Sequence, residues 1–560
     1  MQKSKLNLIT RRGFLDRSMK VSMGIAMATL TDIPFVVKRA LAEGNIGLNG
    51  KKLLFIFLRG ANDSLNSVIP IRDSAYVDFD TTSANFGKST NRPNIVIPPD
   101  QLTDYSTTGP CDFPISASPT AATFSYAKAI RTGNGFAALH PSLKFLAPVY
   151  NAGDLALIHR VGYPNQSRSH FDSQNYWENG APNNKLVTDG IFHRAMIQSG
   201  LANTAPLTGI SIQSALPRIL QGNGAAMTNL SDPTRYDLLG IPHTGGDLKA
   251  DAAIKNANLY PFSGKMNREF LGLQYENLSS TLPIFASIGF SDSTNTYKDA
   301  DVDGTGATGT DGDDDFYYLF PTSNAKNGGY ALHGNDTSKY VIDTGGYSLF
   351  TNLKAASLIL NQTDAIVAGT EFSGFDTHNN QGSVTGGHAN LQRRIGWAMY
   401  SLRKFFKIYG KNGTTPMTGA KVSWDDLIVV TLSEFGRTSI QNGSFGTDHA
   451  EAGVMFMAGG GLKGYGKPGG NGLYACSTGG SVPWQTGQAG SMFGAGGRYL
   501  KRAVDYRQVL GKLIRDHLGA SQNQLNQIIP GYANPTENLI IGGNSIDGTP
   551  ILSESALSFI

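Results

Sequence analysis

The sequence is poor in charged residues, and no hydrophobic run long enough to cross a bilayer follows its first 42 residues. Charged side chains make up 16% of the 560 residues, below the roughly 25% usual in soluble domains. The G-x-S-x-G and H-E-x-x-H patterns are also absent, which removes the commonest serine esterase and zinc protease signatures. With 40% hydrophobic residues the chain is not disordered, and 67 glycines indicate long loops and many turns.

The small net charge of +4 comes from the beginning of the chain. Residues 1–42 carry a net charge of +6, so the remaining residues together carry −2. No basic arm, basic helix or basic run with interleaved aromatic residues follows. We therefore expect no nucleic-acid partner.

The first 42 residues predict a twin-arginine signal peptide. Arg11 and Arg12 precede a modestly apolar stretch at 21–37, and Ala40-Leu41-Ala42 has the small-x-small pattern of a cleavage site. Polar residues and a proline interrupt the stretch, which disfavours the alternative of a transmembrane anchor. We expect the twin-arginine translocation machinery to export the folded protein to the periplasm or the cell exterior, with no stable membrane span after cleavage.

Export would place both cysteines, Cys111 and Cys476, in an oxidising compartment where a disulfide is permitted. The two residues are far apart in the sequence. The pattern therefore leaves open whether they pair or remain two buried thiols.

Four short apolar runs predict buried parallel strands, at residues 53–58, 155–158, 427–432 and 454–458. Apolar residues at helical spacing predict helices at 143–150, 390–409 and 506–518. Strands that alternate with helices predict an α/β fold, in which a largely parallel sheet carries helices on both faces. Ligands of such sheets bind beyond the carboxyl ends of the strands.

We expect residues 43–560 to form one such domain, with long loop insertions near 73–137 and 222–350. The second insertion holds Asp299, Asp301 and Asp303 at the spacing of the first half of a calcium loop, but Thr310 stands where a bidentate Glu is expected. An irregular calcium site and a solvated acidic loop both stay open.

The glycine-rich segment 459–464 imitates a nucleotide-binding loop. Such loops deliver backbone N–H groups at the start of a helix. Here Pro468 replaces the hydroxyl residue that would bind magnesium, and Gly469-Gly470 prevents a helix from starting. We therefore expect a turn and not a nucleotide site.

Four polar segments next to the predicted strand ends carry the side chains that bind metals or act as nucleophiles, at residues 59–66, 162–172, 374–378 and 433–449. Mixed sets of Asp, Glu and His suit zinc, manganese or other divalent cations that activate an oxygen nucleophile. Any one Asp-His pair is also common on ordinary protein surfaces. The shared position of the four segments beside strand ends favours a metal site.

Seven motifs in fixed order lie at residues 139–143, 167–171, 374–378, 432–438, 446–449, 458–464 and 505–508. Together they resemble the bacterial family called domain of unknown function 1501, over residues about 50–520 with long insertions. That family is usually exported by twin-arginine signals, and it resembles more distantly the alkaline phosphatase and sulfatase superfamily. The resemblance implies an alkaline phosphatase/sulfatase-like α/β fold with metal ligands after the strand ends.

The superfamily pattern implies a set of metal ligands. Asp63 corresponds to the acidic ligand after the first strand, and His449 corresponds to the last histidine ligand. Glu434 stands where an Asp-His pair normally follows a strand, which would leave one metal position weak or empty. The expected ligands of a divalent cation (zinc, manganese or calcium) are Asp63, Asp376, His378, Glu434, Asp448 and His449. Of these, Asp448 would either bind an ion or orient its neighbour His449.

The expected catalytic residues are Arg168, Ser169, His170 and Arg437. Ser169 would be the nucleophile if His170 begins a helix whose N-terminal dipole favours an alkoxide. The alternative, that Ser169 is only a helix cap, stays open. The two arginines would bind a phosphate or sulfate group, or else pair with nearby acids.

These residues predict an exported metal-dependent hydrolase of phosphate or sulfate esters, acting on a small-molecule or polymer substrate. The alternative is a non-catalytic periplasmic or surface protein that keeps the fold for binding or assembly. The Asp, Glu and His set favours the hydrolase, whereas the missing second Asp-His pair favours the binding protein.

Overall fold

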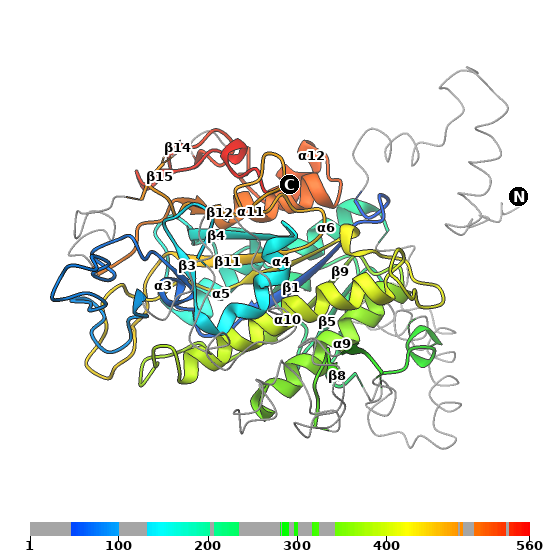
Figure 1. Ribbon diagram of the computed structural model, residues 1–560. Coiled ribbons are helices and arrows are strands. Elements are labelled where there is room, and N and C mark those ends of the chain that lie inside the picture. The colour runs from blue at the N-terminus through cyan, green and yellow to red at the C-terminus, as the bar shows by residue number, and fades with distance from the viewer. Residues whose placement is uncertain are drawn as a thin grey trace, which may run out of the picture. The chain divides into compact units, whose positions relative to one another are not determined.

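Among the described residues, nine strands form one mixed, mostly parallel sheet through the middle of the protein (Figure 1). The strand order is β12-β4-β11-β10-β1-β9-β5-β6, and β13 also pairs with β4. At the centre, β1 (Lys52–Leu58) runs parallel to β10 (Leu427–Leu432) on one side and to β9 (Val367–Phe372) on the other. The fold is therefore α/β with a mostly parallel sheet.

The computed structural model describes residues 46–99, 131–201, 207–233, 281, 283–290, 296–300, 316–323, 342–479, 482–484, 498–533 and 537–560. These residues belong to one compact unit, Asn45–Ile560. The expected signal peptide, the acidic residues 301–315, Cys111 and much of both expected insertions lie outside the described residues.

The remaining strands of the sheet are β4 (Leu155–Gly162), β5 (Gly209–Ile212), β6 (Thr228–Leu230), β11 (Gly453–Ala458), β12 (Leu473–Tyr474) and β13 (Val504–Asp505). The expectation of a parallel strand at 454–458 is wrong, because β11 runs antiparallel to both β10 and β4. The other pairings within the sheet are parallel. A buried strand looks the same in sequence whichever way it runs, so its apolar run could not reveal its direction.

Three two-stranded pairs lie apart from the main sheet. They are β2 (Val68–Ile69) with β3 (Ala138–Leu139), β7 (Lys298–Ala300) with β8 (Phe316–Tyr318), and β14 (Gly543–Asn544) with β15 (Pro550–Ile551). The first pair brings together the two ends of the expected insertion at 73–137.

Strand β1 explains why helices cover both faces of the sheet. Its seven residues are all buried, and alternate side chains point to opposite faces. Leu54, Ile56 and Leu58 join one hydrophobic core, together with α9 (Tyr347–Gln362) and α10 (Gly387–Tyr409). Leu53, Phe55 and Phe57 join a second core, with α6 (Ile191–Ser199), α11 (Tyr506–Lys512) and α12 (Gln522–Ile528).

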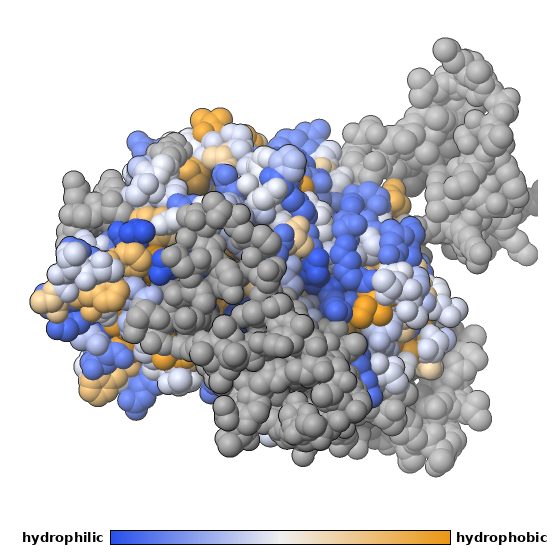
Figure 2. Space-filling view, in the orientation of Figure 1, coloured by the Kyte–Doolittle hydropathy of each residue, from blue (hydrophilic) through white to orange (hydrophobic). Residues whose placement is uncertain are grey.

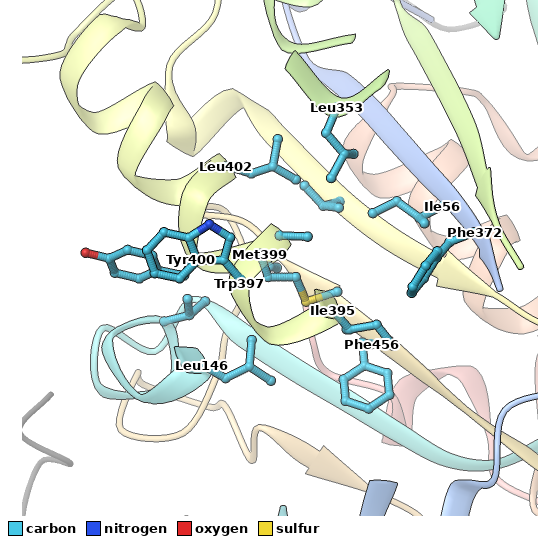
Figure 3. Packing of buried hydrophobic residues seen from close by; sticks show 14 of the residues in the cluster. Ile56, Leu146, Leu353, Phe372, Ile395, Trp397, Met399, Tyr400, Leu402 and Phe456 are labelled. Atoms are coloured by element: carbon cyan, nitrogen blue, oxygen red, sulfur yellow. The ribbon is translucent and has the colours of Figure 1, made fainter. Parts of the chain in front are cut away.

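Figure 3 shows part of the first core. Leu353 of α9 lies next to Ile56 of β1, and Trp397 and Leu402 of α10 belong to the same cluster as Phe456 of β11. All five side chains are buried, so the long helix α10 is held to the sheet by its apolar face. Because α10 begins shortly after the loop that follows β9, this packing also fixes that loop.

Two of the predicted helices are irregular. The segment expected at 143–150 forms a 3₁₀ helix (Pro141–Leu146) followed by α4 (Ala147–Asn151), and the segment expected at 506–518 continues from α11 into a π-helical turn (Leu513–His517). Two further α-helices are α3 (Ser64–Ser67) and α5 (His170–Asn179). Both begin at polar segments next to the sheet.

Strand β9 is the main element that the sequence did not predict. Its apolar pattern is broken by Gly369 and Glu371. Gly369 lies beneath Phe55 of β1, where an added Cβ would come within 1.9 Å of the ring. The glycine is therefore needed for the packing of the neighbouring strand, and that same glycine hides the strand from a search for apolar runs.

The described surface is mostly polar. On the face seen in Figure 2, apolar residues outside the grey regions occur in small groups among hydrophilic ones. Within the described part of the chain, no helix combines the length and the apolar character needed to cross a membrane.

Candidate metal centre

The loops that follow β1, β9 and β10 meet beyond the carboxyl edge of the three parallel strands. Gly60, after β1, donates its N–H to Glu434 Oε1 at 2.8 Å, which joins the first loop to the third. Gly60 has φ +110°, and an added Cβ would lie 2.3 Å from the backbone nitrogen of Asp376. Only glycine allows the loops after β1 and β9 to come this close.

The side chain of Arg437 links the same loops. Its side chain is fully buried, and Nε donates to the carbonyl of Ala61 at 2.9 Å while Nη1 donates to the carbonyl of Thr447 at 3.0 Å. The Nη2 group contacts the carbonyl of Gly60 and the carboxylate of Asp376. The expected role of Arg437 in binding an anionic substrate does not match this position, because its donors are already bound to the protein.

Three histidines and one aspartate converge at the edge formed by these loops. The Nε2 atoms of His170 and His378 lie 3.0 Å and 2.9 Å from Nε2 of His449. Asp376 Oδ1 lies 3.1 Å from Nε2 of His378 and 3.5 Å from Nε2 of the other two histidines. The ligand atoms of His170, Asp376 and His449 thus form one compact group, and Nε2 of His378 borders it next to His449 and Asp376.

The other ring nitrogen of each histidine faces a group that can only accept a hydrogen bond. Nδ1 of His170 lies 2.7 Å from Glu434 Oε1, Nδ1 of His378 lies 3.0 Å from Asp448 Oδ1, and Nδ1 of His449 lies 2.8 Å from the Arg168 carbonyl. The proton of each neutral ring must therefore be on Nδ1. Each Nε2 then turns an unprotonated lone pair toward the other ligand atoms.

Three lone pairs and a carboxylate oxygen that face one another repel unless a positive charge lies between them. The donor set, three imidazole nitrogens and one carboxylate, is the one that zinc and related divalent cations prefer. A tetrahedral zinc site with bonds of about 2.0–2.1 Å places its ligand atoms roughly 3.3 Å apart. Asp376 Oδ1 and the Nε2 atoms of His170 and His449 lie 3.0 Å, 3.5 Å and 3.5 Å from one another, which is close to that separation. The residues present therefore fit a divalent cation.

The surroundings shift the ionisable groups of the site in different directions. Burial alone would raise the pKa of Asp376, but the hydrogen bond and charge of Arg437 outweigh it and hold that pKa below its ordinary value. The hydrogen bond to Glu434 raises the pKa of His170, whereas burial and then the charge of Arg437 lower the pKa of His449. The Asp376 side chain is half exposed, so the site is open to solvent.

Glu434 and Asp448 were both expected as metal ligands. In the structure each lies behind a histidine, against its Nδ1 atom. Glu434 is buried and orients His170, and Asp448 orients His378. Asn442 Nδ2 donates to Asp448 Oδ1 at 2.9 Å, and Arg498 forms an ion pair with Asp448 Oδ2 at 2.7 Å. A hydrogen-bonded carboxylate behind a ligating histidine is the usual support of a zinc site.

Asp63, the expected ligand after the first strand, does not join the converging atoms. It caps α3 and is fully buried, with Oδ2 2.7 Å and Oδ1 3.1 Å from the guanidinium of Arg92. Gln381 Nε2 donates to Oδ2 at 2.6 Å. Burial alone would raise the pKa of Asp63, but the charge of Arg92 reverses the shift and keeps its pKa low. The structure thus places Asp63 in a structural ion pair.

Of the expected catalytic residues, His170 lies among the converging ligands and Ser169 caps the helix that begins with it. The Asp172 N–H faces Ser169 Oγ at 3.4 Å, and Ser169 is exposed. Arg168 Nη2 forms an ion pair with Glu451 at 3.2 Å, and its side chain is 43% exposed. Both alternatives that the sequence left open, a cap for Ser169 and acidic partners for the arginines, match these contacts.

The sequence did not single out the residues that support the site. Arg92 and Arg498 lie outside the noted motifs, Asn442 lies between the motifs at 432–438 and 446–449, and no local pattern marks any of the three. Gly60 stands inside a polar segment that was noted, but only the close approach to Asp376 reveals why it must be glycine.

With this geometry in place, the chain can be compared with known proteins. Residues 355–471 match the family model described as Protein of unknown function (DUF1501). This DUF1501 segment contains Asp376, His378, Glu434, Arg437 and His449. No curated protein and no solved structure matches the chain. The expected likeness to alkaline phosphatases and sulfatases therefore has no support from these comparisons.

Proposed function

We propose that this protein is an exported metal-dependent hydrolase of phosphate or sulfate esters. The observation that carries the proposal is the convergence of three unprotonated imidazole nitrogens on Asp376, each imidazole being held from behind by an acceptor. Neutral histidines held in this way have their ligating lone pairs fixed in direction before any cation binds. The site also lies at the carboxyl edge of the parallel strands, where α/β sheets bind ligands.

His170, His378, His449 and Asp376 would hold the cation. A bound divalent cation supplies Lewis-acid chemistry, since it polarises an ester oxygen and makes a water molecule acidic enough to attack. Asp376 is the most exposed of the four side chains, at 50% against 28%, 36% and 26% for the histidines. Its carboxylate is therefore the group best placed to accept a proton from an incoming water molecule.

The rim of the site supports an anionic substrate. Arg498 is 48% exposed and pairs with Asp448 behind His378, while Arg168 is 43% exposed and its carbonyl binds His449. Both guanidinium groups lie over the Tyr499 ring, with the Cζ atoms of Arg168 and Arg498 4.1 Å and 5.9 Å from its centroid. Guanidinium groups favour phosphate and sulfate oxygens because they donate two parallel hydrogen bonds.

Water, and not Ser169, is the attacking group in this proposal. Ser169 Oγ faces the N–H of Asp172 in its capping role, and His170 Nδ1 is already bound to Glu434, so neither ring nitrogen of His170 is left to take the serine proton. A serine without a base is a weak nucleophile at neutral pH.

The test uses the protein purified after export in its own host. Metal content is measured first, followed by hydrolysis of p-nitrophenyl phosphate, bis-p-nitrophenyl phosphate and p-nitrophenyl sulfate with and without a chelator. The proposal expects about one divalent cation per chain and turnover of at least one ester that the chelator abolishes. Asp172→Asn is the matched control. It changes an acidic residue in the helix that begins with His170, and among the described residues that carboxylate pairs only with Lys185.

The non-catalytic alternative makes a different prediction. Four protein ligands already complete a tetrahedral zinc site, which is the arrangement of structural centres. Stoichiometric metal with no turnover of any of the three esters would favour a binding or assembly protein over the hydrolase.

A further inference from the structure

A second, polar cavity of about 200 Å³ lies at the same edge of the sheet as the metal centre. Gln213 follows β5, and Glu371 and Phe372 are the last residues of β9, so the cavity opens beyond the carboxyl ends of these two strands. Asn352 and Ser348 of α9 form its other wall. Neither the sequence motifs nor the DUF1501 segment assigns any role to it.

The groups that line the cavity can form many hydrogen bonds but carry no positive charge. They are two amides, three serine hydroxyls and one carboxylate, and no lysine or arginine occurs among the described lining residues. Glu371 accepts a hydrogen bond from Arg59 Nε at 2.9 Å, which leaves further acceptor positions on the carboxylate. A cavity wall that holds a carboxylate but no lysine or arginine repels an anionic ligand.

Gln213 lines the cavity with a mostly buried side chain that is 6% exposed. Its backbone fixes its place, because its N–H donates to the Leu230 carbonyl at 3.0 Å and its carbonyl accepts from Asn229 Nδ2 at 3.1 Å.

The cavity and the metal centre are close enough to bind two parts of one molecule. Only two residues separate Ser373, at the cavity, from Asp376, at the metal centre, so their Cα atoms are at most about 11 Å apart. Ser373, Gly374 and Asp376 are all exposed along this path. The cavity is smaller than the roughly 300–1,000 Å³ of sites for drug-sized ligands, which fits one ring and not an oligomer.

We infer that the cavity binds the uncharged, hydroxyl-rich part of the substrate, a single sugar or another polyol, whose ester group then reaches the metal centre. This inference rests on the proposed ester hydrolase for its catalytic half. Hydroxyl groups both donate and accept hydrogen bonds, so a polyol satisfies Glu371 as an acceptor and the serine and asparagine groups as donors. The anionic part of the substrate is directed to Arg168 and Arg498, away from Glu371.

Binding is tested directly with the full-length metal-loaded protein, by saturation-transfer NMR with D-glucose, D-galactose, myo-inositol and glycerol. At least one of the four is expected to show transfer, and Glu371→Gln and Asn352→Ala are each expected to weaken it at least fivefold. Asn223→Ala changes a polar residue that lines a different cavity, and it is expected to leave the signal unchanged. No transfer from any of the four, or equal transfer in all variants, overturns the inference.

A kinetic comparison separates this inference from the proposed function. D-glucose 6-sulfate and D-glucose 6-phosphate are compared with the p-nitrophenyl esters, and Glu371→Gln is expected to lower kcat/KM at least tenfold for a sugar ester and less than twofold for an aryl ester. Sugar binding without turnover of any ester supports the cavity and overturns the hydrolase. Aryl ester hydrolysis without polyol binding supports the hydrolase and overturns the inference about the cavity. Equal losses of kcat/KM for the sugar ester and the aryl ester in Glu371→Gln have the same consequence.

Discussion

Nε2 of His378 lies 2.9 Å from Nε2 of His449, although neither nitrogen carries the proton that a hydrogen bond between them would need. The protons are on the opposite side of each ring, where Asp448 and the Arg168 carbonyl accept them. Two lone pairs at this distance repel each other unless a positive charge lies between them. The contact therefore points to metal binding more directly than any of the sequence motifs.

The first prediction concerns the ligands. His378→Ala is expected to lower the stoichiometry of bound zinc or manganese at least tenfold, because loss even of a group behind a ligand costs about 10–100-fold in affinity. Elemental analysis after dialysis measures the content. Asp172→Asn, in the same helix as His170, serves as the control and keeps its metal. Unchanged metal in both His378→Ala and His449→Ala would contradict the shared site.

The second prediction concerns Arg437, whose buried guanidinium joins the loops after β1 and β9. Arg437→Met leaves several buried carbonyls without donors and Asp376 without its partner, so the free energy of unfolding is expected to fall by about 3–5 kcal/mol. Urea unfolding measures the loss. Arg168→Met, which removes a half-exposed ion pair, should cost less than about 1 kcal/mol. Equal losses in the two variants would show that Arg437 has no special positioning role.

The third prediction separates a cap from a nucleophile. Ser169→Ala is expected to keep ester turnover within a few-fold of the native protein, while lowering the free energy of unfolding by about 0.5–2 kcal/mol through loss of the N-cap of α5. Turnover with p-nitrophenyl phosphate and p-nitrophenyl sulfate provides the kinetic measurement. A fall of a hundredfold or more in kcat, with normal metal content, would restore Ser169 as the nucleophile.

The fourth prediction concerns pH. Burial lowers the pKa of His140 and His159 to about 3, and of His388 and His517 to about 4. Below about pH 6.5 the unfolded chain takes up protons on these rings and the folded chain does not. The stability they contribute is therefore complete above pH 6.5 and is lost as the pH falls toward 3–4.

As the pH falls through that window, each of these rings lowers the free energy of unfolding by about 1.4 kcal/mol per pH unit. Urea unfolding at about pH 7.5 and about pH 5.5, with chelator present so that metal binding does not contribute, measures the combined slope. His517→Gln, in the C-terminal part of the fold, is expected to make the slope shallower by about one proton. A free energy of unfolding that does not change with pH would contradict burial of these neutral rings.

The fifth prediction concerns export and does not depend on the metal centre. Changing Arg11 and Arg12 together to lysine is expected to leave unprocessed protein in the cytoplasm, because the twin-arginine pair is the recognised feature of the signal. Cell fractionation and the size of the product measure it. Normal processing of this double variant would show that the segment is not a twin-arginine signal.

Much of the site could be predicted because its residues lie in short motifs at strand ends. Asp376, His378 and His449 were expected as ligands, and all three converge. The sequence could not show which of the other acids bind the metal, because residue type alone makes Asp63, Glu434 and Asp448 equally suitable as ligands. Only the contacts separate Asp63 in its ion pair with Arg92 from the two carboxylates that support histidines.

The sequence by itself determined the class of the fold, because buried strands such as β1 and β10 need continuous apolar runs and amphipathic α10 needs one apolar face. It also determined which segments hold polar groups at strand ends. The tertiary structure decided the direction of β11, the inclusion of β9 and the position of His170 among the ligands. These depend on which segments meet in space, since residues more than 200 positions apart supply one donor set, and no local pattern records such a meeting.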